Sequence, residues 1–352
     1  NEIIKSLGKF YKYSFQKKNL KKYKTKLNYR IIGMGGSSLG AKAIYDFLKH
    51  KIKKNFRFID NLNNNFSKEK KNYTNIIISK SGNTLETIIN SNIIINKGDK
   101  NIFITEKKNS YLYLFAKKLK AEIIHHNNFI GGRYSVLSEV GMLPAELMGL
   151  NSNNFKIFND LIKNKNFMNN LISNVGSILY FSQKKKFNSV IINYDEKSES
   201  IFKWYQQLVA ESLGKNKKGI LPIVSNMPKD NHSVMQLYLD GFENNFFTFF
   251  YVNGGKSLKI NNNLLLKSQN NLRNKNISNI TYFQKKASEN VFRKKNIPFR
   301  SFDIKKRDEK TLSEIFSFFI LETILLGKCL NVDPYNQPAV ELIKKETNRI
   351  LI

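Results

Sequence analysis

The turn at residues 79–84, with the sequence Ser-Lys-Ser-Gly-Asn-Thr, gathers three hydroxyl groups, one ammonium group and the N–H groups of a following helix. A helix start binds anions through its free backbone donors and its dipole. Gly82 permits the tight turn that brings the backbone close to a ligand. The alternative is an ordinary helix cap, made by Ser81 or Asn83 without any ligand. We therefore treat this turn as a candidate phosphate site.

A second turn, at residues 33–40, has the sequence Gly-Met-Gly-Gly-Ser-Ser-Leu-Gly and begins like several known motifs. A dinucleotide fingerprint would need glycine at Ser38, and a nucleotide P-loop would end in Gly-Lys-Ser or Gly-Lys-Thr, so NAD and ATP are disfavoured. The turn also contains the Gly-x-Ser-x-Gly pattern of hydrolases, and Asp230 and His232 follow in the hydrolase order. They are only two residues apart, and a hydrolase would leave the first turn without a role. We disfavour that interpretation.

Three further residues could supply a carboxylate base, a positioned cation and an imidazole acid. Glu211 follows Gln207 by four positions, which places both side chains on one face of a predicted helix. Arg133, in the segment Gly-Gly-Arg-Tyr-Ser, supplies a cation that is always ionised. His232 lies between a polar loop and an amphipathic helix, where an imidazole could act as an acid. Alone, Glu211 could be an exposed helix-end residue and His232 a helix cap, but their combination with Arg133 favours acid–base chemistry.

The first half of the chain alternates apolar runs with amphipathic stretches, which is typical of a parallel sheet with connecting helices. A parallel sheet binds its ligands at the carboxyl ends of its strands, and both candidate turns follow such ends. We expect one five-stranded parallel sheet here. Its predicted strands are residues 29–34, 56–59, 74–78, 101–105 and 122–125.

The polar residues 151–154 form the predicted junction between two domains, at residues 1–150 and 151–352. The strand and helix pattern resumes after this junction, whereas residues 261–279 have weak periodicity and read as a surface excursion. The predicted strands are 189–194, 219–224 and 246–252, and the predicted helices are 198–213, 233–239, 311–330 and a last one from about residue 339.

Composition allows two domains of ordinary size, because the chain has 352 residues of which 41% are hydrophobic. Its 59 basic and 27 acidic residues give a net charge of +32. The lysines are scattered rather than gathered into one patch, so we expect no nucleic-acid partner. The single cysteine, Cys329, excludes an internal disulfide. With no signal-like or membrane-spanning stretch, we expect a cytoplasmic protein without membrane contact.

Taken together, these segments resemble the phosphoglucose isomerase family, from about residue 29 to residue 350. The resemblance implies two sugar-isomerase (SIS) domains, each a mainly parallel five-stranded sheet flanked by helices. It also implies a homodimer whose active sites lie at the subunit interface. The segments that carry it are residues 33–40, 131–135, 207–215, 232–241 and 333–344.

By resemblance, Glu211 would carry a proton between C2 and C1 of an open-chain hexose 6-phosphate, and Arg133 would stabilise the cis-enediolate. His232, from the neighbouring subunit, and Lys344 would assist ring opening. No metal or organic cofactor would be needed. The implied substrate-binding residues are Gly36, Ser37, Ser79, Lys80, Ser81, Thr84, Gly132, Gln207 and Gln337.

The resemblance implies reversible isomerisation of glucose 6-phosphate and fructose 6-phosphate, in glycolysis and gluconeogenesis. The Ser-Gly-Asn-Thr part of the first turn also occurs in other SIS proteins, including isomerases that accept mannose 6-phosphate and regulators. A dual phosphoglucose and phosphomannose isomerase therefore stays open as an alternative. So does a sugar-phosphate sensor, although a sensor would not need Glu211, His232 and Lys344 in register.

Overall fold

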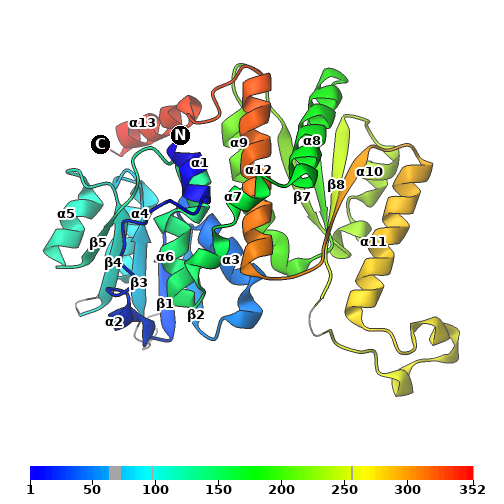
Figure 1. Cartoon of the computed structure of the whole chain (residues 1–352), viewed down its shortest axis with the longest axis horizontal. Helices are drawn as coiled ribbons and strands as arrows, with labels where there is room; N and C mark the ends of the chain where they lie inside the picture. Colours follow the sequence, from blue (N-terminus) through cyan, green and yellow to red (C-terminus); the bar gives the residue numbers. More distant parts are fainter. Residues whose placement is uncertain (63–72, 97, 255–256, 352) are drawn as a thin grey trace.

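Two parallel sheets with their covering helices make up the chain (Figure 1). The structure is a computed structural model, and it describes residues 1–62, 73–96, 98–254 and 257–351. The first sheet has the strand order β2-β1-β3-β4-β5, and every pair in it is parallel. All five strands predicted in the first half are confirmed. They are β1 Asn28–Ile32, β2 Asn55–Ile59, β3 Thr74–Ile78, β4 Lys100–Thr105 and β5 Glu122–His125.

The second sheet has four strands among the described residues, in the order β7-β6-β8-β9, so the prediction of five strands in each sheet is wrong here. It is also parallel throughout. Sequence patterns missed β9, because this edge strand carries Arg300 and Asp303 and is only half-buried. The strands are β6 Asn188–Asn193, β7 Leu221–Asn226, β8 Asn245–Val252 and β9 Phe299–Ile304.

Helices α3, α6, α9 and α12 lie between the two sheets and join them through one continuous core (Figure 1). Ile31 of the first sheet and Ile191 of the second belong to the same buried cluster. The division into domains at residue 150 therefore stays a prediction. The helices are α3 Leu39–Phe47, α6 Glu139–Met148, α9 Glu199–Leu213 and α12 Glu309–Cys329.

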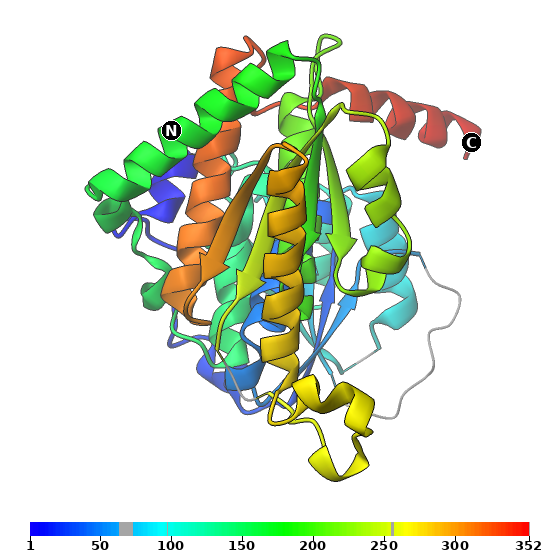
Figure 2. The same cartoon turned by 90° about the vertical axis from the view of Figure 1, so that its right-hand side faces the viewer.

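The outer face of the second sheet is covered by α10 and α11 (Figure 2). The excursion predicted at residues 261–279 is shorter than expected, because α11 begins at Ile277 behind an asparagine capping box. The remaining helices are α1 Glu2–Leu7, α2 Lys21–Lys24, α4 Leu85–Ile94, α5 Tyr111–Lys118, α7 Phe158–Leu161, α8 Lys165–Gln183, α10 Met235–Asp240, α11 Ile277–Lys294 and α13 Pro338–Ile350.

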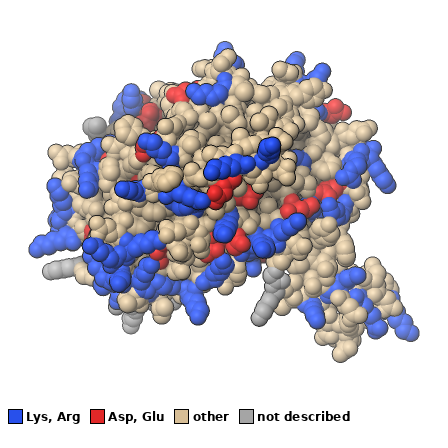
Figure 3. Space-filling model, viewed as in Figure 1, with Lys and Arg blue, Asp and Glu red and all other residues tan. Residues whose placement is uncertain are grey.

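Basic side chains are spread widely over the face of the molecule seen in Figure 3, with acidic side chains among them. Several of these charges form surface ion pairs, such as Lys22 with Glu122 at 2.7 Å and Lys9 with Asp160 at 2.9 Å. Within the described ranges, no helix is both long enough and apolar enough to cross a bilayer.

Candidate active site

The candidate phosphate turn follows β3 and leads into α4. Ser79 is buried, and its Oγ lies 2.8 Å from Thr84 Oγ1 and accepts a hydrogen bond of 3.2 Å from the Gly82 N–H. Gly82 has a φ of +69°, and a Cβ there would lie 2.1 Å from Ser110 Oγ, so only glycine fits. Thr84 makes no side-chain cap on α4. The first backbone donors of α4 are therefore available to an anion.

Lys80 extends from the same turn toward the loop after β5. Its Nζ donates to the Asn128 carbonyl oxygen at 2.7 Å and lies 3.9 Å from Glu106 Oε1. Burial lowers the pKa of the Lys80 ammonium from its ordinary value, while Glu106 opposes that shift. Ser81 is exposed and accepts a hydrogen bond from the Asn83 N–H. The turn thus presents an ammonium group, hydroxyls and backbone donors together.

The glycine turn after β1 packs directly on two other parts of the site. A Cβ on Gly36 would lie 2.2 Å from the carbonyl carbon of Gly132, so two backbones touch here. Gly35 has a φ of +53°, and a Cβ there would lie 2.7 Å from Gln207 Nε2. Ser37 follows in the same 3-10 turn and is half-buried. Small residues are therefore required where these segments meet.

Arg133 is buried at the centre of the site, with a side chain that is 1% exposed. Its Nη1 donates to Glu211 Oε2 at 3.1 Å and to Gln337 Oε1 at 2.7 Å. Its Nη2 donates to the carbonyl oxygens of Pro334 at 2.7 Å and Asn336 at 3.1 Å. Its Nε donates to Ser212 Oγ at 2.8 Å. All five guanidinium N–H groups thus have an acceptor, which fixes the cation in place.

Glu211 stands near the end of α9, with its side chain 28% exposed. One carboxylate oxygen faces Arg133, and the other accepts from Gln207 Nε2 at 2.9 Å. Gln207 Oε1 is buried and has no hydrogen-bond partner within the described part of the chain. Lys215 donates to the backbone carbonyls of Glu211 and Ser212 and so closes the end of the helix. A partly exposed carboxylate held between an amide and a cation can accept and return a proton.

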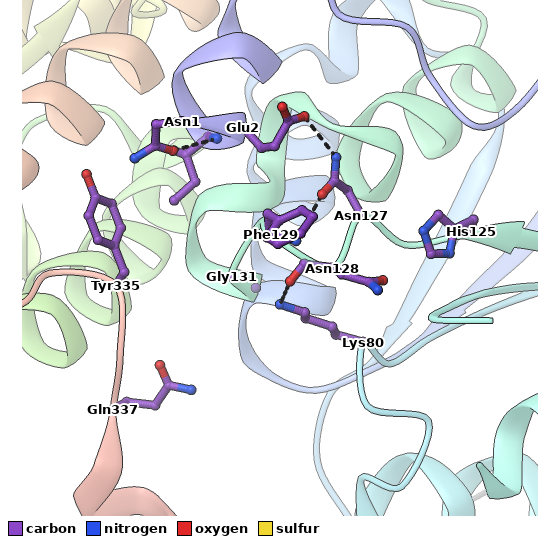
Figure 4. Close-up of a pocket in the computed structure, with 12 residues that line it drawn as sticks. Asn1, Glu2, Lys80, His125, Asn127, Asn128, Phe129, Gly131, Tyr335 and Gln337 are labelled. Carbon is purple, nitrogen blue, oxygen red and sulfur yellow. Dashed lines mark hydrogen bonds between the residues drawn. The ribbon is translucent and has the colours of Figure 1, made fainter. Parts of the chain in front are cut away.

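A cavity of about 940 Å³ opens beside these residues at the carboxyl edge of the first sheet. Figure 4 shows Tyr335 and Gln337 on one side of it and Lys80 and His125 on the other. Three predicted site residues line it, namely Lys80, Gly132 and Gln337. Sequence patterns did not single out Asn127, Asn128, Phe129 and Tyr335, which also line it, because none of them stands in a motif with known chemistry.

His232 lies away from Glu211 in the same chain. α9 runs from the carboxyl end of β6 back to the amino end of β7, so Glu211, near its end, lies at the amino edge of the second sheet. His232 is exposed in a 3-10 turn beyond the carboxyl end of β7. With six residues in β7, the two side chains are separated by roughly 20 Å along the strand.

Lys344 also lies apart from the cluster around Arg133. It is exposed on α13, where it pairs with Glu341 at 2.6 Å. Gln337, which contacts Arg133, is the N-cap of this helix. Seven residues of helix place Lys344 about 10 Å further along the axis. Direct contacts therefore connect Arg133 with Glu211 and Gln337, Glu211 with Gln207, and Gly36 with Gly132. Lys80 lines the adjoining cavity, whereas His232 and Lys344 lie apart.

The hydrolase alternative finds no support in this geometry. Ser38, the residue in the nucleophile position of the Gly-x-Ser-x-Gly pattern, is fully buried and donates to the Gly35 carbonyl at 3.3 Å. Asp230 accepts from the Asn226 N–H and lies with His232 at the far edge of the second sheet. Across the described ranges, no group of three or more histidine, cysteine or acidic side chains could hold a metal ion.

Sequence patterns gave no role to Ser212 and Tyr134, although both lie next to the Arg133 guanidinium. Both are fully buried, and their hydroxyl groups lie 2.8 Å apart. A single serine or tyrosine carries no pattern of its own. The available signal was position, since Ser212 follows Glu211 and Tyr134 follows Arg133 directly.

Two relatives with known names are similar to this chain over most of its length. The glucose-6-phosphate isomerase of Methanocaldococcus jannaschii is 32% identical over 355 residues, which cover 95% of this chain and 87% of that protein. The glucose-6-phosphate isomerase of Mycoplasmopsis pulmonis is 31% identical, over 91% of this chain and 82% of that protein.

Two solved structures share the fold. A glucose-6-phosphate isomerase from Chlamydia trachomatis superposes with a TM-score of 0.75 at 18% identity, over 95% of this chain and 72% of that one. A hypothetical protein from Thermus thermophilus superposes with a TM-score of 0.86 at 20% identity, over 95% and 87%. Residues 17–225, more than half of the chain, match phosphoglucose isomerase as a family. Because this family match covers more than half of the chain and relatives matched over most of their length are more than 30% identical, the chain belongs to the phosphoglucose isomerase family.

Proposed function

We propose that this protein interconverts glucose 6-phosphate and fructose 6-phosphate. The observation that carries the proposal is the buried Arg133 guanidinium, fixed 3.1 Å from the Glu211 carboxylate beside a cavity that reaches Lys80. An aldose–ketose isomerisation needs a base that gives its proton back, a cation for the developing oxyanion and an anchor for the phosphate. The proposal is supported by the cavity lining, because Lys80 shares it with Gln337, which contacts Arg133.

The proton transfer follows from the surroundings of Glu211. Its carboxylate removes the C2 proton of the open-chain aldose, the C–H electrons form the C1=C2 double bond, and the carbonyl electrons move to O1. Arg133 stabilises this oxyanion through its fixed positive charge, because its neighbours already hold the guanidinium in place. Glu211 then returns the proton to C1, while O1 gains a proton and O2 loses one. No oxidant, metal or organic cofactor enters this balance.

The phosphate dianion is held at the 79–84 turn in this proposal. The uncapped start of α4, the Ser79 and Thr84 hydroxyls and the Lys80 ammonium all supply donors. Lys80 now donates to the Asn128 carbonyl, and it would exchange this neutral acceptor for a charged phosphate oxygen. Gln207, whose Oε1 has no partner in the described residues, would accept from a sugar hydroxyl.

A homodimer with shared sites accounts for the position of His232. Because His232 lies roughly a strand length from Glu211 within one chain, it would act on the sugar bound by the partner subunit. The exposed apolar residues Val340 and Ile343 on α13 are consistent with a second chain covering that helix. Ring opening would then use His232 of the partner subunit together with Lys344. A glycolytic role, in the cytoplasm, is the corresponding cellular setting.

A coupled assay of the purified protein tests the activity. We expect turnover of fructose 6-phosphate to glucose 6-phosphate, detected by oxidation of the product, in the presence of a metal chelator. Mannose 6-phosphate run in parallel separates a narrow isomerase from the dual phosphoglucose and phosphomannose isomerase. Binding of fructose 6-phosphate without turnover would instead identify a sugar-phosphate sensor.

Mixing two inactive variants tests the shared site. Glu211→Gln and His232→Ala chains, unfolded and refolded together, would form some mixed dimers with one intact site. We expect activity to return toward about a quarter of wild type in a statistical mixture of dimers. Activity that stays at the level of the separate variants would show that each chain supplies its own histidine.

A further inference from the structure

Two nitrogens of the Arg133 guanidinium, Nε and Nη2, are held by a closed ring of hydrogen bonds. Arg133 Nε donates to Ser212 Oγ at 2.8 Å, and Ser212 Oγ lies 2.8 Å from Tyr134 Oη. Tyr134 Oη donates to the Pro334 carbonyl oxygen at 2.9 Å. That same oxygen accepts from Arg133 Nη2 at 2.7 Å, which closes the ring.

The chemistry of these groups fixes the direction of every bond. A backbone carbonyl only accepts, so the Tyr134 hydroxyl proton must point at Pro334. Tyr134 Oη must then accept from the Ser212 hydroxyl, which in turn accepts from Arg133 Nε. Each hydroxyl donates one bond and accepts another, and no arrangement with the opposite direction satisfies both. The ring therefore has one orientation.

The ring ties together three segments that are distant in the sequence. Arg133 and Tyr134 come from the turn before α6, Ser212 from the end of α9 and Pro334 from the segment before α13. Ser212 and Tyr134 are both completely buried, so water cannot replace a lost partner. Ser212 directly follows Glu211, so the same residue fixes the cation relative to the base.

We propose that Ser212, supported by Tyr134, is a positioning residue that aims the Arg133 guanidinium at the oxyanion formed during isomerisation. The inference rests on the proposed isomerase function. Neither hydroxyl is placed to touch the substrate, because Ser212 and Tyr134 are completely buried and neither of them lines the cavity. Ser212 sets the rotation of the guanidinium plane through Nε, while Glu211 and Gln337 contact only Nη1.

Removing the Ser212 hydroxyl tests this role. Ser212→Ala leaves the phosphate turn and Glu211 intact, so we expect KM within about twofold of wild type and kcat lower by about 10- to 100-fold. Affinity for a phosphorylated arabinonohydroxamate, which mimics the charged enediolate, should fall in parallel with kcat. Affinity for sorbitol 6-phosphate, which carries no such charge, should change by less than about threefold.

Tyr134→Phe is the second variant and keeps the buried ring that packs 6.0 Å from Tyr335. It leaves Ser212 free to accept from Arg133 but without its own acceptor, so we expect a smaller loss of kcat, of about 3- to 10-fold. Ser317→Ala is the matched control, since it removes an equally buried hydroxyl on α12 that has no partner in the described residues. It should leave kcat and KM unchanged.

The outcomes separate this inference from the proposed function. An inactive wild-type protein would reject the isomerase itself. With an active wild type, unchanged kcat and unchanged hydroxamate affinity in both variants would overturn the positioning role. Equal weakening of the hydroxamate and of sorbitol 6-phosphate would overturn it too, because that result indicates general damage. If thermal unfolding shows that Ser212→Ala does not fold, the affinities of Tyr134→Phe for the hydroxamate and for sorbitol 6-phosphate provide the test instead.

Discussion

The carboxyl edges of the two parallel sheets differ, although the sheets are built alike. At the first edge, Gly36 lets two backbones touch, and the uncapped α4 leaves donors available beside a cavity of about 940 Å³. At the second edge, polar groups bind one another: Asn193 donates to Asn226 at 3.0 Å, and the Asn226 N–H donates to Asp230 at 2.7 Å. A sheet edge becomes a ligand site only where such donors stay uncommitted.

The second half contributes to the site from its other end. Glu211, Gln207 and Ser212 come from α9 as it returns toward the amino edge of the second sheet. Around Arg133, the carboxyl edge of the first sheet therefore lies next to the amino edge of the second sheet. In the proposed site, the phosphate anchor therefore comes from the first half of the chain and the base from the second.

Replacing the proposed base beside the first edge should lower kcat more than any of the substitutions that follow. Glu211→Gln keeps the size and the contact with Gln207 but removes the proton acceptor, so we expect kcat to fall about 1,000-fold. Affinity for sorbitol 6-phosphate should hold within a few-fold. Glu199→Gln, on the exposed first turn of the same helix at the second edge, is the control and should leave kcat unchanged. Near-normal turnover by Glu211→Gln would remove it from the base role.

Adding one methyl group at the first edge should cause the next largest loss of activity. In Gly36→Ala the new Cβ would overlap the Gly132 carbonyl, so the two turns must separate. We expect a loss of about 100-fold in kcat/KM and of about 1–3 kcal/mol in the free energy of unfolding.

Gly176→Ala, in the middle of α8, is the matched control for that substitution. A Cβ there meets no atom within 4 Å, so the free energy of unfolding should rise by up to about 1 kcal/mol without a change in activity. If both alanine variants behaved alike, close backbone contact at the first edge would not matter for catalysis.

The phosphate turn can be compared directly with its counterpart in the second sheet. Ser79→Ala removes a buried hydroxyl next to Thr84, and we expect KM for fructose 6-phosphate to rise about tenfold. Ser225→Ala removes a buried hydroxyl at the carboxyl end of β7, where it bonds Tyr238, and should leave KM unchanged. Steady-state kinetics of both variants would contradict the comparison if their KM values moved together.

The smallest expected effect concerns pH. Burial lowers the pKa of Lys80, so its ammonium loses the proton at a lower pH than an exposed lysine would. KM for fructose 6-phosphate should therefore rise on the alkaline side, by about two- to fivefold. Lys80→Arg stays charged in that range and should flatten the rise. Identical alkaline profiles for the two proteins would show that Lys80 does not bind the phosphate as an ammonium.

Strands could be predicted from the sequence where they are buried on both faces and therefore consist mainly of apolar residues. Short apolar runs followed by glycine or serine predicted the first sheet, because buried parallel strands such as β3 contain continuous apolar segments, here the three isoleucines that end the strand. The same rule missed β9, an edge strand that carries Arg300 and Asp303, so sequence patterns identified three of the four strands of the second sheet, whereas the family resemblance implied five.

The residues of the candidate site also fall into two groups, those that sequence motifs indicate and those that only the tertiary packing reveals. Motif residues such as Arg133 and Glu211 could be named from the sequence, but their separation of 3.1 Å depends on tertiary packing. Ser212 could not be named, since its role depends on a bond to a residue that stands 79 positions earlier in the chain. The position of His232 relative to Glu211 followed only once the direction of α9 was known.

A crystal structure with bound sorbitol 6-phosphate tests the central claim most directly. We expect the phosphate within hydrogen-bond distance of the Ser79 and Thr84 hydroxyls and the start of α4. We expect the first two carbons of the same ligand beside the Glu211 carboxylate and Arg133. A phosphate bound at the carboxyl edge of the second sheet, or a ligand that cannot reach both the 79–84 turn and Glu211, would contradict it.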